Sequence, residues 1–194
     1  MPASAHVPAS RGDADAILDV VARLLEEGGD GFLLRDVAKQ ARVSLATVYR
    51  YFPSRDELVI AAVERWMAER VYATLPTVGQ GEPLAEGLTR WFGEFLTPWK
   101  EQPNMLRVYM RTVMLPGGER LTRQGERAFA PSAAQLFDGY DPMFVEDVSM
   151  ILDNVIQGLQ SRFASGQIGM DEIAGSLERT IHRLADGVGP RQRS

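Results

Sequence analysis

The sequence predicts an all-α protein in which a compact three-helix head precedes a larger helical body, with about nine helices in all. Three observations support this fold class. Apolar residues recur at the three- and four-residue steps of an amphipathic helix through most of the chain. No stretch shows the strict alternation expected of a half-buried strand. Clusters rich in glycine and proline divide the chain into segments of helical length.

Composition restricts the classes of protein to which the chain can belong. Its 194 residues are 45% hydrophobic and 24% charged, which is typical of a folded globular protein. There is no cysteine, so disulfides and thiolate metal sites are excluded and a cytoplasmic location is expected. Residues 1–12 lack the pattern of a secretory signal and are predicted to form a flexible arm, as residues 189–194 form a tail. Apolar runs fall far short of the roughly 20 residues that span a bilayer, so no membrane partner is expected.

The head is predicted over residues 13–57. Its first helix begins near Asp13 and ends at the glycines after residue 27, and a short second helix covers 33–41. A three-residue turn leads to Ser44, whose side chain can cap the third helix at 45–52. Pro53 ends that helix, and Ser54 can cap a fourth that runs to about Leu75.

The body is predicted over residues 58–188 and contains the rest of the fourth helix and five more. Their ranges are 84–99, 103–115, 119–137, 143–165 and 171–186. The breaker segments PTVGQGEP, PGG, GYDP and SGQIG separate them. The helix at 84–99 carries the heaviest aromatic load in the chain.

The helix at 45–52 has an unusual exposed face. A helical wheel places Leu45, Val48 and Phe52 on the inner face, Ala46, Thr47 and Arg50 on the outer face, and Tyr49 and Tyr51 on the flanks. A small residue, a methyl-bearing hydroxyl and an arginine allow a helix to enter a DNA major groove. There Thr47 can contact thymine or a base edge, and Arg50 can reach guanine or a phosphate. The flanking phenols can donate to phosphates, which fixes register rather than reading sequence.

Charge supports this interpretation locally, although the whole chain has a net charge of −5. Between residues 35 and 55 there are five basic side chains and one acidic side chain, a local charge of about +4. Arg55 opens a helix, where free amides and the helix dipole also favour a phosphate. The predicted contacts with double-stranded DNA are Arg35, Arg42, Ser44, Ala46, Thr47, Tyr49, Arg50, Tyr51 and Arg55.

Residues 13–60 strongly resemble the helix-turn-helix of TetR-type transcriptional repressors. The resemblance rests on RDVA in the second helix, the valine-serine turn, TVYRYF in the third helix and PSRDEL at the start of the fourth. Two positions depart from the family pattern. Arg42 replaces a common turn glycine and is expected to adopt a left-handed or bridging conformation, and Leu33 replaces the usual Thr or Ser cap of the second helix.

The resemblance implies a homodimeric repressor that leaves a near-palindromic operator when a small hydrophobic effector binds the body. A lipid or an acyl thioester would suit the wide apolar face. The residues expected to line the effector pocket are Trp91, Phe95, Trp99, Met105, Tyr109, Met110, Val113, Met114 and Phe137. The dimer interface is expected to use two apolar stripes of the last helices: Val148, Leu152, Val155, Leu159, Ile173, Leu177, Ile181 and Leu184.

Two other classes of function remain open at this point. One is a ligand-independent DNA-binding regulator controlled by a protein partner, and the other is a helical small-molecule carrier that has lost DNA binding. An enzyme is not expected, because no serine–histidine or paired-acid arrangement is present. His6 and His182 stand apart in a chain without cysteine, so neither a metal nor another cofactor is expected.

Overall fold

The computed structural model describes residues 11–29, 31–79 and 81–186, and these residues contain helices and no strand. The head comprises α1 (Arg11–Glu26), α2 (Leu34–Gln40) and α3 (Leu45–Tyr51). The connecting helix is α4 (Arg55–Trp66), which continues through a π-helical turn, η1 (Met67–Val71), and a 3₁₀ turn, η2 (Tyr72–Thr74). The body contains α5 (Leu84–Phe95), α6 (Thr97–Glu101), α7 (Pro103–Thr112), α8 (Glu119–Leu136), α9 (Pro142–Ala164) and α10 (Met170–Asp186).

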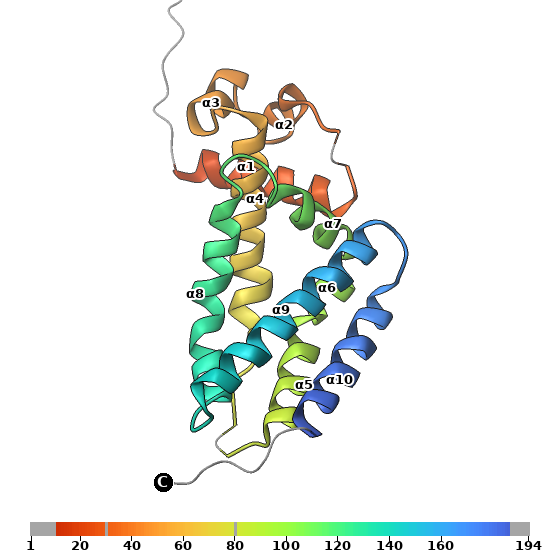
Figure 1. The fold of residues 1–194 in the computed structure, drawn as a ribbon. Helices are drawn as coiled ribbons and strands as arrows, with labels where there is room; N and C mark the ends of the chain where they lie inside the picture. Colours follow the sequence, from red (N-terminus) through yellow and green to blue (C-terminus); the bar gives the residue numbers. More distant parts are fainter. Residues whose placement is uncertain (1–10, 30, 80, 187–194) are drawn as a thin grey trace, which may run out of the picture.

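Figure 1 shows how α4 joins the two parts: α1–α3 gather at its first turns, and its other end lies among the body helices. Helix α8 lies along α4, where Arg120 forms an ion pair with Glu57 at 3.2 Å. Further along α4, Arg65 pairs with Asp19 of α1. The predicted boundary at residues 57/58 thus falls inside one continuous helix, which connects head and body mechanically.

Local sequence signals explain how the head helices begin. The Ser44 hydroxyl accepts from the Thr47 amide at 3.0 Å, and the Ser54 hydroxyl accepts from the Glu57 amide at 3.1 Å, so both predicted caps are confirmed. Helix α2 has no side-chain cap at Leu33, as the sequence indicated. One expectation is wrong: Leu45 was assigned to the buried face of α3 but is 40% exposed, while Val48 is buried.

The predicted helix at 84–99 is divided into α5 and α6, which accounts for ten α-helices in the described residues where the sequence suggested about nine. Pro98 has no amide hydrogen to donate to the carbonyl one turn earlier, and its ring crowds that turn. The chain therefore leaves α5 after Phe95 and starts again at Thr97. The apolar spacing continues across this break, so periodicity alone did not reveal it.

The apolar stripes of α9 and α10 face the chain's own core, which corrects the predicted dimer interface. Six of the eight predicted residues are buried within the single chain: Val148, Leu152, Leu159, Ile173, Leu177 and Ile181. Val155 and Leu184 are partly buried against the same core. Helix α10 packs against both α9 and α5, so these side chains are covered without a second chain. Periodicity identifies a face that must be buried but not the surface that covers it.

The predicted arm and tail lie outside the described residues, except that α1 already includes Arg11 and Gly12. In the described part of the chain, no helix has the length and apolar character that crossing a membrane requires.

Candidate nucleic-acid interface and internal cavity

The outer surface of α3 carries most of the side chains predicted to contact DNA. Ala46, Tyr49 and Arg50 are exposed, and Tyr49 is 50% exposed although it is aromatic. The Thr47 hydroxyl lies 2.8 Å from the Ser44 hydroxyl, so these two groups share one hydrogen bond. This leaves the Thr47 methyl as the part of the side chain best placed for a thymine methyl or another apolar edge.

The flanking candidates fall into two groups. Arg35, near the start of α2, and Arg42, in the turn between α2 and α3, are exposed and available to a phosphate backbone. Tyr51 and Arg55 are partly buried and already engaged with the protein. The Arg50 guanidinium lies 5.5 Å from the centroid of the Tyr51 ring, and the Arg55 guanidinium lies 4.7 Å from that of Phe32. The structure therefore exposes Arg42 of the turn and most of the other α3 candidates more clearly than Tyr51 and Arg55.

Arg42 adopts a left-handed backbone with φ of 57°, which confirms the expectation for this turn. Such a conformation costs an ordinary residue about 1–2 kcal/mol relative to the right-handed form. We expect Arg42→Gly to raise the free energy of unfolding by about 0.5–1 kcal/mol, since the greater freedom of glycine in the unfolded chain offsets part of the relief. Urea denaturation measures the change. Arg35→Gly, inside α2, is the matched control and should lower stability by a similar amount, and a stability loss in Arg42→Gly would contradict the prediction.

The body contains a partly open cavity of about 270 Å³ between the turns that follow α4 and helices α5–α9. Five of the nine predicted pocket residues line it: Trp91, Phe95, Trp99, Tyr109 and Phe137. The other four do not, which corrects the prediction for Met105, Met110, Val113 and Met114. Met105 is fully buried in the core, and Met114 is 83% exposed. Met110 and Val113 pack, partly buried, against the core outside the cavity.

Several cavity residues were missed by sequence reasoning. Phe129 of α8 packs edge-on against Trp91 and Phe95, with ring centroids 5.3 Å from each. Tyr72 of η2 lies against the same Phe129 ring at 5.5 Å, and Asp153 of α9 also lines the cavity. The four-residue spacing of Leu121, Gly125 and Phe129 places Phe129 on the inward face of α8, and this signal could have found it.

Burial changes the ionisation of two cavity phenols. Removal from water raises the pKa of Tyr72, and the neighbouring Tyr109 raises it further. Burial also raises the pKa of Tyr109. Both phenols therefore stay protonated and can donate a hydrogen bond. The indole nitrogens of Trp91 and Trp99 are also buried donors, and neither has an acceptor among the described residues.

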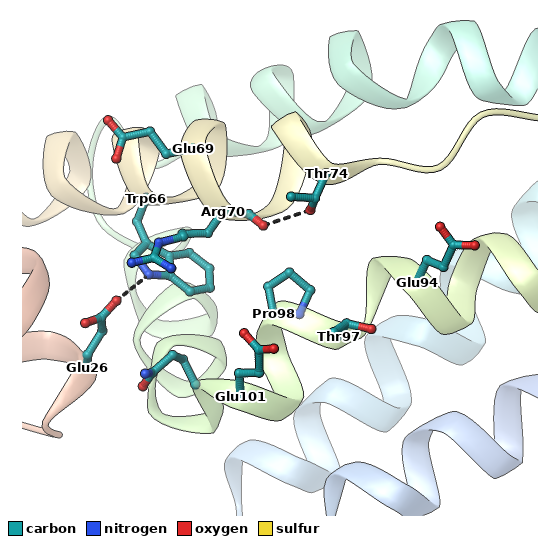
Figure 2. Close-up of a pocket in the computed structure, with 10 residues that line it drawn as sticks. Glu26, Trp66, Glu69, Arg70, Thr74, Glu94, Thr97, Pro98 and Glu101 are labelled. Carbon is teal, nitrogen blue, oxygen red and sulfur yellow. Dashed lines mark hydrogen bonds between the residues drawn. The ribbon is translucent and has the colours of Figure 1, made fainter.

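Two tryptophans in contact, with their rings tilted by 49°, connect this cavity to the head. Trp99 lines the cavity and lies 5.2 Å, centroid to centroid, from Trp66 of α4. The Trp66 Nε1–H donates to the Glu26 carboxylate at 2.8 Å, at the end of α1. Figure 2 shows this bond at the edge of a separate open cleft of about 480 Å³, which Glu69, Glu94 and Glu101 also line. No three histidine, aspartate or glutamate side chains in the described residues are grouped so as to hold a metal ion.

Comparisons with known proteins agree with this geometry over nearly the whole chain. Residues 17–62 match the family of bacterial regulatory proteins called the tetR family, and residues 81–184 match the tetracyclin repressor-like C-terminal domain. The chain is 42% identical over 188 residues to the HTH-type transcriptional repressor KstR of Rhodococcus jostii, covering 91% of this chain and 84% of that protein. It is also 40% identical over 74 residues to an uncharacterized HTH-type transcriptional regulator of Xanthobacter autotrophicus, but this match spans only 38% of the chain and 35% of that relative.

Solved structures show the same fold at lower identity. A TetR transcriptional regulator from Agrobacterium tumefaciens superposes with a TM-score of 0.67 at 19% identity, covering 90% of this chain and 92% of the other. A TetR-like regulator from Rhodococcus sp. RHA1 gives 0.63 at 22% identity, covering 94% and 100%. Fold and head together define a helix-turn-helix transcriptional regulator. The chain belongs to the TetR family, whose members are DNA-binding regulators and not enzymes.

Proposed function

We propose that the protein is a homodimeric repressor that binds a near-palindromic operator through α3 and leaves it when a small hydrophobic effector occupies the cavity. The observation that carries this proposal is the course of one helical segment. Met67 and Tyr72, in the turns that follow α4, line the cavity, while three residues separate the other end of α4 from α3. An effector that shifts this segment changes the position of the recognition helix.

Whether an effector weakens or strengthens operator binding depends on its relative affinities for the DNA-competent and DNA-incompetent arrangements. An effector weakens operator binding only if it binds the DNA-incompetent arrangement more tightly, and typical couplings are about 1–3 kcal/mol. The relative described as a transcriptional repressor supports repression rather than activation. Two α3 helices about one turn of DNA apart would then read two half-sites of an inverted repeat.

Selection of bound fragments from the source genome, with affinity measured at two salt concentrations, tests the proposal. A recovered inverted repeat that keeps its affinity advantage at the higher salt supports a dimeric sequence-specific regulator. Diffuse binding that disappears steeply with salt would mean that phosphate contacts alone hold the protein, which would contradict it.

The outward face of α9 is our candidate for the dimer contact. It exposes Met150 and Ile151, which are 56% and 37% exposed, and Gly158, beside which there is open space. We expect Met150→Glu to raise the dimer dissociation constant by at least about 30-fold, because an unpaired charge would be buried between the subunits. Met114→Glu, at another exposed methionine, should leave the dimer intact. Sedimentation measures both, and an undissociated Met150→Glu dimer would place the contact elsewhere.

A further inference from the structure

The formal charge at the cavity is negative. Among the described residues that line it, only Asp153 carries a formal charge, and none is a lysine, arginine or histidine. Asp153 is exposed as a residue, which puts it at the mouth of the cavity. None of the described residues gives its carboxylate a hydrogen bond or an ion pair. Partial burial raises the pKa of Asp153, because the charged form loses hydration without gaining a partner. A cation at this place would supply that missing partner.

The walls of the cavity also favour positive charge. Eight of its lining side chains are aromatic. Trp91 and Phe95 are stacked with centroids 5.5 Å apart, and the Phe129 ring meets them at 80° and 88°. Aromatic faces carry partial negative charge and attract ammonium groups, most strongly where water is excluded. Rings surrounding a cavity with one unpaired carboxylate form a suitable site for an organic cation.

The buried hydrogen-bond donors further restrict the class of ligand that the cavity can bind. The indole nitrogens of Trp91 and Trp99 and the phenols of Tyr72 and Tyr109 can each donate to an acceptor on a ligand. A carboxylate could use these donors, but it would share a cavity of about 270 Å³ with Asp153 and find no cation there. A neutral ether, carbonyl or hydroxyl oxygen meets the same donors without this repulsion.

We propose that the effector is a small lipophilic organic cation, whose ring lies among the cavity aromatics and whose positive group lies at Asp153. This inference rests on the proposed function, in which the cavity is the effector site. It adds to that function the positive charge of the effector. It disfavours acidic ligands and acyl thioesters, whose phosphates would meet the Asp153 carboxylate.

Three probes of similar size test the class of ligand with the full-length protein. Benzyltrimethylammonium is the cation, neopentylbenzene is its uncharged isostere with carbon in place of nitrogen, and 4-phenylbutyrate is an anion. Tryptophan fluorescence reports binding because two of the three tryptophans line the cavity, and thermal unfolding gives a second readout. We expect the cation to bind about tenfold more tightly than its isostere, and the anion to bind most weakly.

Two variants locate the charge preference. Asp153→Asn should abolish the difference between cation and isostere, while Asp147→Asn, an exposed aspartate of the same helix outside the cavity, should preserve it. If Glu101→Gln, and not Asp153→Asn, abolishes the preference for the cation over its isostere, the cation binds in the open acidic cleft. That result would overturn the proposal. If neopentylbenzene binds more tightly than benzyltrimethylammonium to both the wild type and Asp153→Asn, the effector is not a cation. The cavity would still be an effector site. If no probe changes fluorescence or melting, the effector step of the proposed function fails as well.

Discussion

Replacing Ala46 by glutamate is expected to lower affinity for operator DNA by more than about 100-fold while leaving the fold intact. Ala46 is exposed on the outer face of α3, beside Thr47 and Arg50. A carboxylate there would meet the phosphates and acceptor-rich base edges of the major groove, and like charges forced together cost several kcal/mol. Glutamate is also a good helix former, so α3 should keep its geometry. Fluorescence anisotropy with a labelled operator measures the loss.

The same substitution at Ala134 provides the control. Ala134 is exposed in α8 of the body, so Ala134→Glu changes the net charge by the same amount away from the head. We expect its operator affinity to fall by less than about threefold at moderate salt, where distant charges are screened. Equal losses in the two variants would mean that net charge, and not the α3 surface, controls binding. Circular dichroism must show unchanged helix content in both.

The head could be predicted almost residue by residue because its signals are local. Ser44 and Ser54 cap helices through amides three residues away, and Pro53 ends a helix through its own ring. The left-handed conformation of Arg42 was expected from the resemblance, because this residue stands where the family commonly has a turn glycine. Leu45 is the exception: it lies in the first turn of α3, beyond the reach of the helices that cover Val48.

The body was less predictable because its surfaces are defined by distant partners. The stripes containing Leu152 and Leu177 had the correct period, yet the structure pairs them with their own chain. Whether an apolar helix face meets its own core or a second subunit depends on tertiary packing. The same reason explains why only part of the cavity lining was predicted. The sequence indicated both Trp99 and Met114 as lining residues, but Trp99 lines the cavity and Met114 lies exposed outside it.

Two hydrogen bonds tie the end of α1 to α4 and α7, and Arg107 extends this network to α9, which gives a route by which occupancy of the cavity could affect α3. The Trp66 indole donates to the Glu26 carboxylate, and the Asn104 amide donates to the Glu26 carbonyl at 3.0 Å. Arg107, which lies over the Phe163 ring of α9 at 4.5 Å, approaches the Asn104 side-chain oxygen at 3.4 Å. Glu26 therefore receives contacts from both α4 and α7, so displacement of either helix would shift α1.

Replacing Trp99 by alanine is expected to lower the free energy of unfolding by about 3–5 kcal/mol, the usual effect of deleting a buried tryptophan. Trp99 is 2% exposed and packs against Trp66 and Tyr109. The void would adjoin the existing cavity, so added indole should bind there and restore part of the lost stability. Urea denaturation with and without indole measures both effects. Met114→Ala, at the exposed position, should change stability by less than about 0.5 kcal/mol and show no response to indole.

The same variant separates the stability of the body from its connection to the head. Without Trp99, the Trp66 ring loses its partner at 5.2 Å, and a ligand in the cavity no longer contacts the indole pair that leads to Glu26. At a temperature where Trp99→Ala remains folded, an effector should therefore still bind but lower operator affinity less than it does in wild type. Since coupling is a difference between two binding free energies, both must be measured. An unchanged coupling would show that the signal travels through Met67 and Tyr72 of the α4 segment instead of through the tryptophan pair.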